Sequence, residues 1–153
     1  MSKLDDRLAE LGLTIPEVAK PVAAYVPAVV TGNLVYTSGQ LPFVDGKLPS
    51  TGKVGGAVSP EAAKDMARYC VLNGLAAVKS VIGSLDRVTR IVKVVGFVAS
   101  EPSFDGQSGV VNGASELLGE IFGEAGFHAR SAVGMAALPL NSPIEVEFIV
   151  EFA

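Results

Sequence analysis

An arginine beside a row of very small side chains is the clearest chemical signal in the sequence. That arginine is Arg130. If the chain around it is extended, Ala132, Gly134 and Ala136 lie on its face, because side chains alternate between the two faces of a strand. Arginine stays charged at every physiological pH, and its planar guanidinium matches the geometry of a carboxylate. The small neighbours leave room beside the cation, so we expect an anionic ligand there.

A glutamate stands at the start of the next predicted strand. After a loop at residues 138–143, residues 144–152 alternate between an apolar face and an acidic face that begins with Glu145. In an antiparallel hairpin about this loop, Glu145 would lie opposite about residue 137, roughly 20 Å from Arg130 at about 3.3 Å per residue. The two charges can share a site only if the strands pair differently or if the site lies between subunits.

The composition bounds the class of protein. A chain of 153 residues is long enough to bury its own core, and we expect one domain over residues 1–153 with an N-terminal extension at residues 1–21. The hydrophobic fraction of 49% and the mean hydropathy of +0.43 exceed what one core needs, which favours an oligomer interface. No apolar run is long enough to span a membrane, and a net charge of -4 argues against nucleic-acid binding.

The single cysteine and the single histidine restrict the chemistry further. Cys70 falls in an apolar stripe at helical spacing, so we expect a core residue rather than a nucleophile. His128 alone supplies too few ligands for ordinary zinc chemistry, and we interpret it as an exposed loop residue outside the site. The N-terminal residues mix charges of both signs and lack the apolar core of a signal peptide, which predicts a cytoplasmic protein.

The pattern along the chain predicts an α+β fold with its helices on one face of a sheet. Ser59, Pro60 and Glu61 form a helix start, and Gly83 a helix end. The predicted order is a short N-terminal helix (2–11), a hairpin (28–30 and 33–38), a helix (59–82), a central strand (90–99), a helix (107–124) and two strands (130–137 and 144–152). The face without helices also needs a cover, which oligomerisation would supply.

Two smaller features allow either a functional or an ordinary interpretation. Ser38-Gly39-Gln40 ends a strand with a combination that lets a backbone approach a ligand, although an ordinary turn explains it as well. Asn112 is polar within a helical stretch, and it could equally satisfy backbone groups at the helix surface.

Taken together, these segments resemble the RidA, or YjgF-type, family of reactive intermediate deaminases over residues 22–152. The resemblance lies in Tyr25, residues 34–42 (Leu-Val-Tyr-Thr-Ser-Gly-Gln-Leu-Pro), Asn112, Ala129-Arg130-Ser131, Leu138-Pro139 and residues 144–147 (Ile-Glu-Val-Glu). It implies a chorismate mutase-like mixed sheet with two main helices on one face, and a homotrimer with its sites in clefts between subunits. A cleft of that kind would remove the distance problem between Arg130 and Glu145.

The resemblance also implies an activity, that of a 2-iminobutanoate/2-iminopropanoate deaminase-like hydrolase without cofactor or metal. Such enzymes hydrolyse reactive enamines and imines, such as 2-aminoacrylate, to a 2-keto acid and ammonia. Arg130 would hold the substrate carboxylate through paired hydrogen bonds, and Glu145 would activate the attacking water. The expected substrate-binding residues are Tyr25, Ser38, Gly39, Asn112 and Ala132.

Several departures place the chain in a divergent branch. Ala23-Ala24 stand where the family often has Gly-Pro, and Ala132 stands where it often has cysteine, which excludes thiol chemistry at the site. Gly134 and Ala136 are smaller than the usual residues, so we hypothesise a pocket for a larger anion than aminoacrylate. The loop at residues 43–58 is longer than in the family.

Two alternatives to the deaminase remain open. One is a trimeric module that binds small carboxylate metabolites without turnover through the same arginine. The other is an endoribonuclease or translation inhibitor, an activity attributed to some relatives. The acidic balance and the scattered basic residues disfavour an RNA partner.

Overall fold

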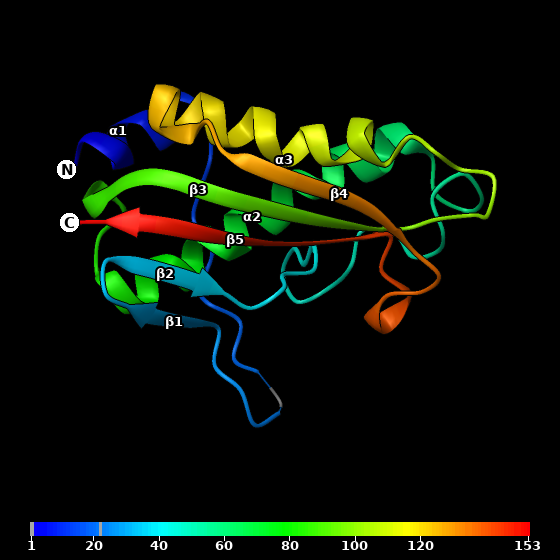
Figure 1. The fold of residues 1–153 in the computed structure, drawn as a ribbon, viewed down its shortest axis with the longest axis horizontal. Coiled ribbons are helices and arrows are strands. Elements are labelled where there is room, and N and C mark those ends of the chain that lie inside the picture. The colour runs from blue at the N-terminus through cyan, green and yellow to red at the C-terminus, as the bar shows by residue number, and fades with distance from the viewer. Residues whose placement is uncertain (1, 22) are drawn as a thin grey trace.

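A mixed sheet forms the centre of the fold (Figure 1). Within residues 2–21 and 23–153 it has five strands, in the order β1-β2-β5-β3-β4. This computed structural model describes only those residues, so Met1 and Val22, where the family resemblance begins, lie outside it. The strands are β1 (Ala28–Thr31), β2 (Leu34–Thr37), β3 (Val88–Ala99), β4 (Ala129–Met135) and β5 (Ile144–Phe152). Only β3 and β4 pair in parallel, which confirms a mixed α+β sheet.

Two long helices, α2 (Pro60–Ile82) and α3 (Gln107–Phe122), cover one face of this sheet (Figure 1). The predicted start of α2 is confirmed, because the side chain of Ser59 accepts a hydrogen bond from the Ala62 N–H and proline occupies the first turn. Gly83 ends the helix at φ 86°, a conformation that few residues other than glycine adopt. Short 3₁₀ segments follow at Leu85–Arg87, Gly123–Gly126 and Pro139–Asn141.

The short helix α1 (Lys3–Glu10) lies against the end of α3, as its amphipathic pattern predicts. The Nε of Arg7 donates a hydrogen bond of 2.8 Å to the Glu120 carbonyl of α3. The Leu4 N–H donates to the Asp86 carboxylate at 2.8 Å. None of the helices that the structure describes combines the length and the apolar character needed to cross a bilayer.

The hydrophobic core lies between the helices and the sheet. Along β5, buried and half-buried residues alternate, which confirms the predicted alternation. Cys70 of α2 is fully buried, as expected, and burial followed by the nearby Glu145 charge raises the pKa of its thiol well above the usual range. The thiol is therefore protonated at physiological pH and packs as a core residue.

The last two strands are not neighbours, so the hairpin geometry considered from the sequence is wrong. β3 lies between β4 and β5, because the helical crossover α3 returns the chain to the outer edge of β3 and the loop at residues 136–143 then passes the end of β3. Arg130 pairs with Val94 in the parallel register, and Glu145 pairs with Phe97 in the antiparallel one. The two charges thus lie two strands and three residues apart on the sheet.

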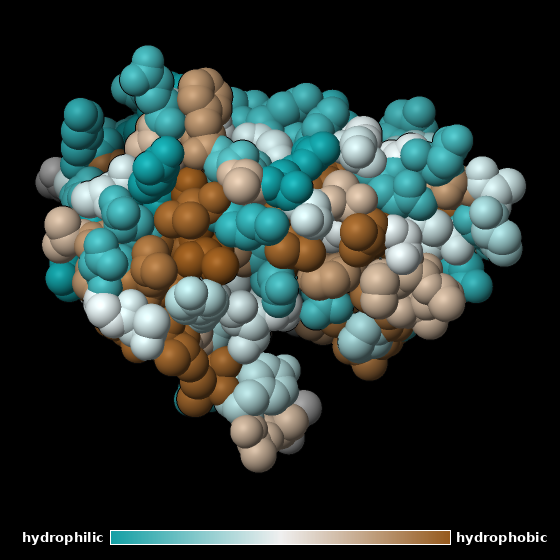
Figure 2. Space-filling model, viewed as in Figure 1, coloured by the Kyte–Doolittle hydropathy of each residue, from teal (hydrophilic) through white to brown (hydrophobic). Residues whose placement is uncertain are grey.

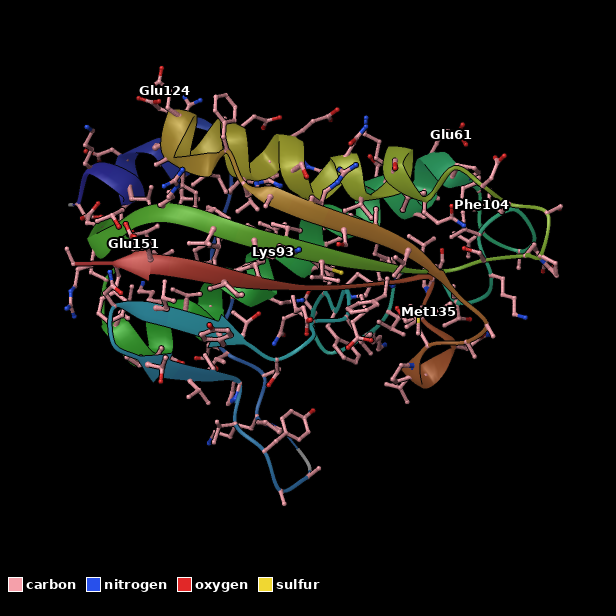
Figure 3. The ribbon with its side chains drawn as sticks, viewed as in Figure 1. Glu61, Lys93, Phe104, Glu124, Met135 and Glu151 are labelled. Carbon is pink, nitrogen blue, oxygen red and sulfur yellow. The ribbon has the colours of Figure 1, made fainter. Side chains whose placement is uncertain are left out.

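The face of the sheet opposite the helices is uncovered within the described residues, and it carries large apolar side chains beside the carboxylates of β5. Large hydrophobic side chains on it include Val29 (53% exposed), Tyr36 (43%) and Val133 (41%). Figure 2 shows hydrophobic residues gathered over the strands on this side, and Figure 3 shows Lys93 projecting from β3 among them. We predicted a central strand that is covered on both faces. Within the described residues, this chain covers only the helix-facing side of β3.

Replacing Gly74 tests how closely α2 packs on the sheet. A Cβ at this position would overlap the buried ring of Phe148 on β5. Over-packing costs about 1 to 3 kcal/mol, and alanine gains up to about 1 kcal/mol in helix propensity. We expect Gly74→Ala to lower the free energy of unfolding by about 1 to 2 kcal/mol in urea denaturation followed by circular dichroism.

Gly119 of α3 provides a matched control, since no atom lies within 4 Å of the position where its Cβ would stand. Gly119→Ala should leave the protein as stable or raise its stability by up to about 1 kcal/mol. A Gly74→Ala protein that is stabilised to the same extent would show that α2 can move off the sheet at no cost.

Candidate functional site

Arg130 lies on the edge strand β4 and turns its side chain toward α3. Its partner in the register, Val94, is buried under the helices, so Arg130 belongs to the helix-covered face. Its Nη1 donates to the Asn112 Oδ1 at 2.7 Å and to the Ser115 Oγ at 3.2 Å, and its Nη2 donates to the Ser108 carbonyl at 3.4 Å. The guanidinium is therefore held against one side of α3. Asn112 serves the arginine rather than the backbone of its own helix.

All of these acceptors are neutral. No carboxylate of residues 2–21 and 23–153 forms a salt bridge with Arg130, which is half-buried. The Nε–H and the Nη2 beside it make up the edge that binds carboxylates through two parallel hydrogen bonds. In the described part of the chain the Nε–H has no acceptor, and Nη2 makes only the long bond to Ser108. Arg130 thus presents an uncompensated cation with its carboxylate-binding edge available.

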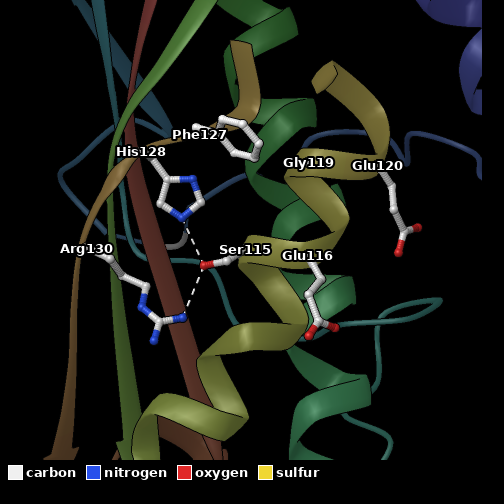
Figure 4. A pocket seen from close by; sticks show the side chains of 7 residues that line it. All are labelled: Ser115, Glu116, Gly119, Glu120, Phe127, His128 and Arg130. Carbon is white, nitrogen blue, oxygen red and sulfur yellow. Dashed lines mark hydrogen bonds between the residues drawn. The ribbon is translucent and has the colours of Figure 1, made fainter. Parts of the chain in front are cut away.

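The cleft beside Arg130 contains a second polar contact, between Ser115 and His128 (Figure 4). The Ser115 Oγ lies 2.9 Å from the His128 Nε2, and the His128 Nδ1 lies 2.6 Å from the Gly126 carbonyl oxygen. This shallow cleft of about 640 Å³ runs between β4 and α3. Its remaining lining residues are Glu116, Gly119, Glu120 and Phe127.

Glu145 belongs to a separate cluster on the opposite face of the sheet. A Cβ on Gly39 would overlap the Glu145 carboxylate, so this glycine lets the carboxylate lie against the backbone. Gln40 and Val146 exchange backbone hydrogen bonds of 2.8 and 3.0 Å, which hold the Ser38-Gly39-Gln40 segment beside the start of β5. The functional interpretation of this glycine therefore gains support over an ordinary turn.

Tyr25 and Ser38 extend this cluster toward the segment before β1. The Ser38 Oγ donates to the Val26 carbonyl at 2.6 Å, and the Ser38 N–H donates to the Pro27 carbonyl at 2.8 Å. These bonds fix the chain next to Tyr25, whose side chain is 57% exposed. Of the predicted site residues, Tyr25, Ser38 and Gly39 thus accompany Glu145, whereas Asn112 accompanies Arg130.

Partial burial raises the pKa of Glu145, and the neighbouring Glu147 carboxylate raises it further. None of the salt bridges within the described residues includes Glu145. A carboxylate with a raised pKa is a stronger base than an ordinary surface glutamate, which is the property required for taking a proton from water near neutral pH.

A single chain cannot bring the two charged groups together. Arg130 shares its face with the buried Val94, whereas Glu145 shares the open face with Phe97. Two strand spacings of about 4.8 Å and three residue steps of about 3.3 Å also separate them. The sequence-based alternatives therefore reduce to a site between subunits, if the two residues share one at all.

One of the small residues beside Arg130 contributes to packing, although we expected it to leave space for a ligand. Gly134 faces α3, and a Cβ there would lie 2.9 Å from the Gln107 Nε2. The Gln107 side chain therefore occupies part of the space beside Gly134, and a pocket for a larger anion stays a prediction. Ala132 lies on the same face, and its methyl group packs against the core.

Sequence reasoning missed Ser115 and set His128 aside. The alternation of an extended segment already placed His128 on the face of Arg130, two residues away, and that was the available signal. Ser115 carried no comparable signal, because a serine on a half-exposed helix position is common. Its role depends on the packing of α3 beside β4, which only the fold provides.

Replacing Glu145 by glutamine tests the electrostatic state of this residue. Because the folded-state pKa is raised, the stability contributed by the protonated form is present at low pH and is lost as the pH rises through that pKa. Glutamine is permanently neutral. For chains diluted until they are monomeric, we expect Glu145→Gln to have a higher urea midpoint than the wild type at pH 7, with the difference shrinking toward pH 4.

The exposed Glu17 serves as the control for a simple change in net charge. Glu17→Gln should follow the wild type across the same pH range. A Glu145→Gln protein that is less stable than the wild type at pH 7 would mean that the carboxylate has a favourable partner in the assembled protein.

Comparisons with known proteins agree with this architecture. A protein of unknown function from Agrobacterium tumefaciens has a crystal structure that superposes with a TM-score of 0.91 at 47% identity, covering 98% of this chain and 92% of that one. Protein TCP17 of Trypanosoma cruzi is 43% identical over 145 residues, which is 94% of this chain and 91% of the relative. The 2-iminobutanoate/2-iminopropanoate deaminase of Escherichia coli K12 is 34% identical over 130 residues, covering 84% of this chain and 87% of the relative.

The family model described as "YjgF/chorismate_mutase-like, putative endoribonuclease" matches residues 5–152. The match includes both charged clusters and every strand of the sheet. Together with the 34% identical deaminase, it shows that this chain belongs to the YjgF/RidA family.

Proposed function

We propose that the protein is a homotrimeric deaminase that hydrolyses short 2-imino or enamine acids to 2-keto acids and ammonia. Each site would combine Arg130 of one subunit with Glu145 of the next. The observation that carries this proposal is the pair of uncompensated charges. Among the residues that the structure describes, a half-buried cation without a carboxylate and a half-buried carboxylate without a cation lie on opposite faces of the sheet.

Arg130 would bind the carboxylate of the substrate. Its Nη1 is occupied by Asn112 and Ser115, so the guanidinium cannot rotate freely, and the Nε edge is left for the ligand. Charge-assisted hydrogen bonds of this type contribute about 1.5 to 3 kcal/mol each. Two of them also fix the orientation of the carboxylate plane, and hence the position of the adjacent imine carbon.

Glu145 would act as the general base. It takes a proton from a water molecule, the hydroxide oxygen bonds to the imine carbon, and the electron pair of the C=N bond moves to nitrogen. Glu145 returns this proton to nitrogen, which gives the neutral carbinolamine. Glu145 then takes the hydroxyl proton and passes it to nitrogen as the C=O bond forms and the C–N bond breaks, so that one water is consumed for each keto acid and ammonia released. Partial burial and the raised pKa of Glu145 suit it to both proton transfers.

The remaining predicted residues would shape the site from both subunits. Gly39 and Ser38 stand beside Glu145, and Tyr25 is exposed next to them, where it can close over a ligand held by a neighbouring chain. On the other side, Ala132 follows Arg130 along the edge strand and leaves its approach unobstructed. We propose that these residues bind the substrate and do not transfer protons.

The uncovered sheet face supports the oligomeric part of the proposal. Its apolar side chains extend from β1 to β4, and burying them between copies of the chain would be favourable in proportion to the apolar area removed from water. A second copy on this face also brings an edge strand of another chain close to Glu145.

We still predict that the protein is cytoplasmic.

The activity is tested by measuring ammonia and keto-acid release from 2-aminoacrylate generated in situ from serine by a dehydratase. We expect the protein to accelerate release. Glu145→Gln should lose about 10² to 10⁴ of the acceleration, as is typical for removal of a general base, and Arg130→Ala should lose it entirely at low substrate concentration. Carboxylate binding without turnover would instead identify a trimeric binding module.

Mixing the two inactive variants tests whether the site is shared. If Arg130→Ala and Glu145→Gln chains are unfolded together and reassembled, a cyclic trimer with shared sites carries both native residues in about one quarter of its sites. About a quarter of the wild-type activity should then return. No recovery, with mixed trimers present in native mass spectrometry, would exclude a site between these residues of different subunits.

The assembly itself is tested with two matched valines. Val133 on the open face of β4 and Val81 on α2 are 41% and 40% exposed, so either can accept glutamate without disturbing the core. In sedimentation velocity we expect Val133→Glu to form monomers and Val81→Glu to remain trimeric, because only the first places a charge in the proposed interface. Two trimeric variants would remove the sheet face from the interface.

A further inference from the structure

A directional chain of hydrogen bonds ends on Arg130, and it starts at a backbone carbonyl. The Gly126 carbonyl can only accept, so the His128 Nδ1 at 2.6 Å must carry a hydrogen. In the neutral imidazole this leaves Nε2 as an acceptor, 2.9 Å from the Ser115 Oγ. Ser115 therefore donates its only hydrogen to His128.

This orientation of the hydroxyl determines what Ser115 offers to Arg130. With its hydrogen directed at His128, the Ser115 Oγ turns a lone pair to the Arg130 Nη1 at 3.2 Å. Asn112 accepts the other Nη1 hydrogen at 2.7 Å. Both hydrogens of Nη1 are thus bound to α3, and the Nε edge is left as the part of the guanidinium that a ligand can reach.

We propose that His128 is a positioning residue that, in its neutral form, holds the Arg130 guanidinium through Ser115 for binding the ligand carboxylate. This inference rests on the proposed function of Arg130. Protonation of the imidazole reverses the hydrogen bond between Ser115 and His128, because Nε2–H then donates to the Ser115 Oγ. Two cationic donors would meet on one hydroxyl oxygen, and the hydroxyl hydrogen would lose its acceptor.

The carboxylates near His128 have other partners. The imidazole is therefore the group that controls the contact between Ser115 and Arg130. On α3, Glu116 pairs with Lys64 of α2 at 3.2 Å, and Glu120 pairs with Arg68 of α2 at 3.6 Å. Across the sheet edge, a neighbouring hollow at the imidazole is lined by Arg90 of β3 and Glu151 of β5. Glu151 already accepts a bond of 2.6 Å from the Thr89 hydroxyl.

The test measures binding of 2-ketobutyrate by calorimetry at pH 8 and pH 6, at one ionic strength. The ligand carboxylate stays anionic at both values. The wild type should bind about two- to tenfold more weakly at pH 6, the range expected for loss of one hydrogen bond. Ser115→Ala and His128→Phe should show that loss already at pH 8.

His128→Gln separates positioning from charge. Glutamine can place its amide oxygen near the position of Nε2 and accept from Ser115, yet it does not titrate. This variant should bind within about threefold of the wild type at pH 8 and should lose the histidine-dependent part of the pH effect. Any pH dependence that it retains measures other groups, including the raised pKa of Glu145.

Ser108→Ala is the matched control on the same helix, because Ser108 contributes only its backbone carbonyl to Arg130. It should bind like the wild type at both pH values. In the turnover assay, Ser115→Ala should raise KM with little change in kcat, since the carboxylate is held equally in the bound substrate and in the transition state.

Three results would overturn the inference. Wild-type affinity that increases toward pH 6, with no increase in His128→Gln, would show that the imidazolium attracts the ligand directly. Normal binding by both Ser115→Ala and His128→Phe, with Arg130→Ala unable to bind, would reject the positioning role and leave the proposed function intact. Normal binding by Arg130→Ala would reject the proposed function and this inference together.

Discussion

The alternation of side chains across one sheet keeps Arg130 and Glu145 apart, and the rest of the molecule is arranged around that separation. Arg130 faces the helices from the outer strand β4, where α3 supplies neutral acceptors that hold a cation without cancelling its charge. Glu145 faces the opposite side, where Gly39 permits a carboxylate against the backbone and partial burial keeps its pKa raised. Each charged group is held by its own local contacts, and within the described residues neither forms a salt bridge.

This division explains why an apolar sheet face is retained at the surface of one chain. A face that carries Val29, Tyr36 and Val133 together with an electrostatically strained glutamate is unfavourable for an isolated monomer in water. Association through that face would bury the apolar area and bring a foreign arginine toward the glutamate at the same time.

The parts of the fold that local chemistry determines could be predicted from the sequence, and the parts that depend on packing could not. Ser59, Pro60 and Gly83 mark the ends of α2 because caps act within one turn. The alternation in β5 shows which face is buried. The insertion of β5 between β2 and β3 has no local signal, since its pairing partners lie more than forty residues away in the chain. For the same reason Ser115 was not predicted, and the interpretation of His128 as an exposed loop residue is wrong, because its half-buried ring contacts Ser115 and the Gly126 carbonyl.

The central position of β5 also has a consequence for how the chain acquires its structure. β5 follows every other strand in the chain order, yet it joins the β1-β2 hairpin to the β3-β4 pair. Until it has been synthesised, these two units have no shared ladder, and the apolar side of α2 lacks much of the surface that it covers. Folding must therefore wait for long-range pairing, which is slow and leaves strand edges exposed. Losing the nine residues of β5 would therefore divide the sheet rather than shorten it.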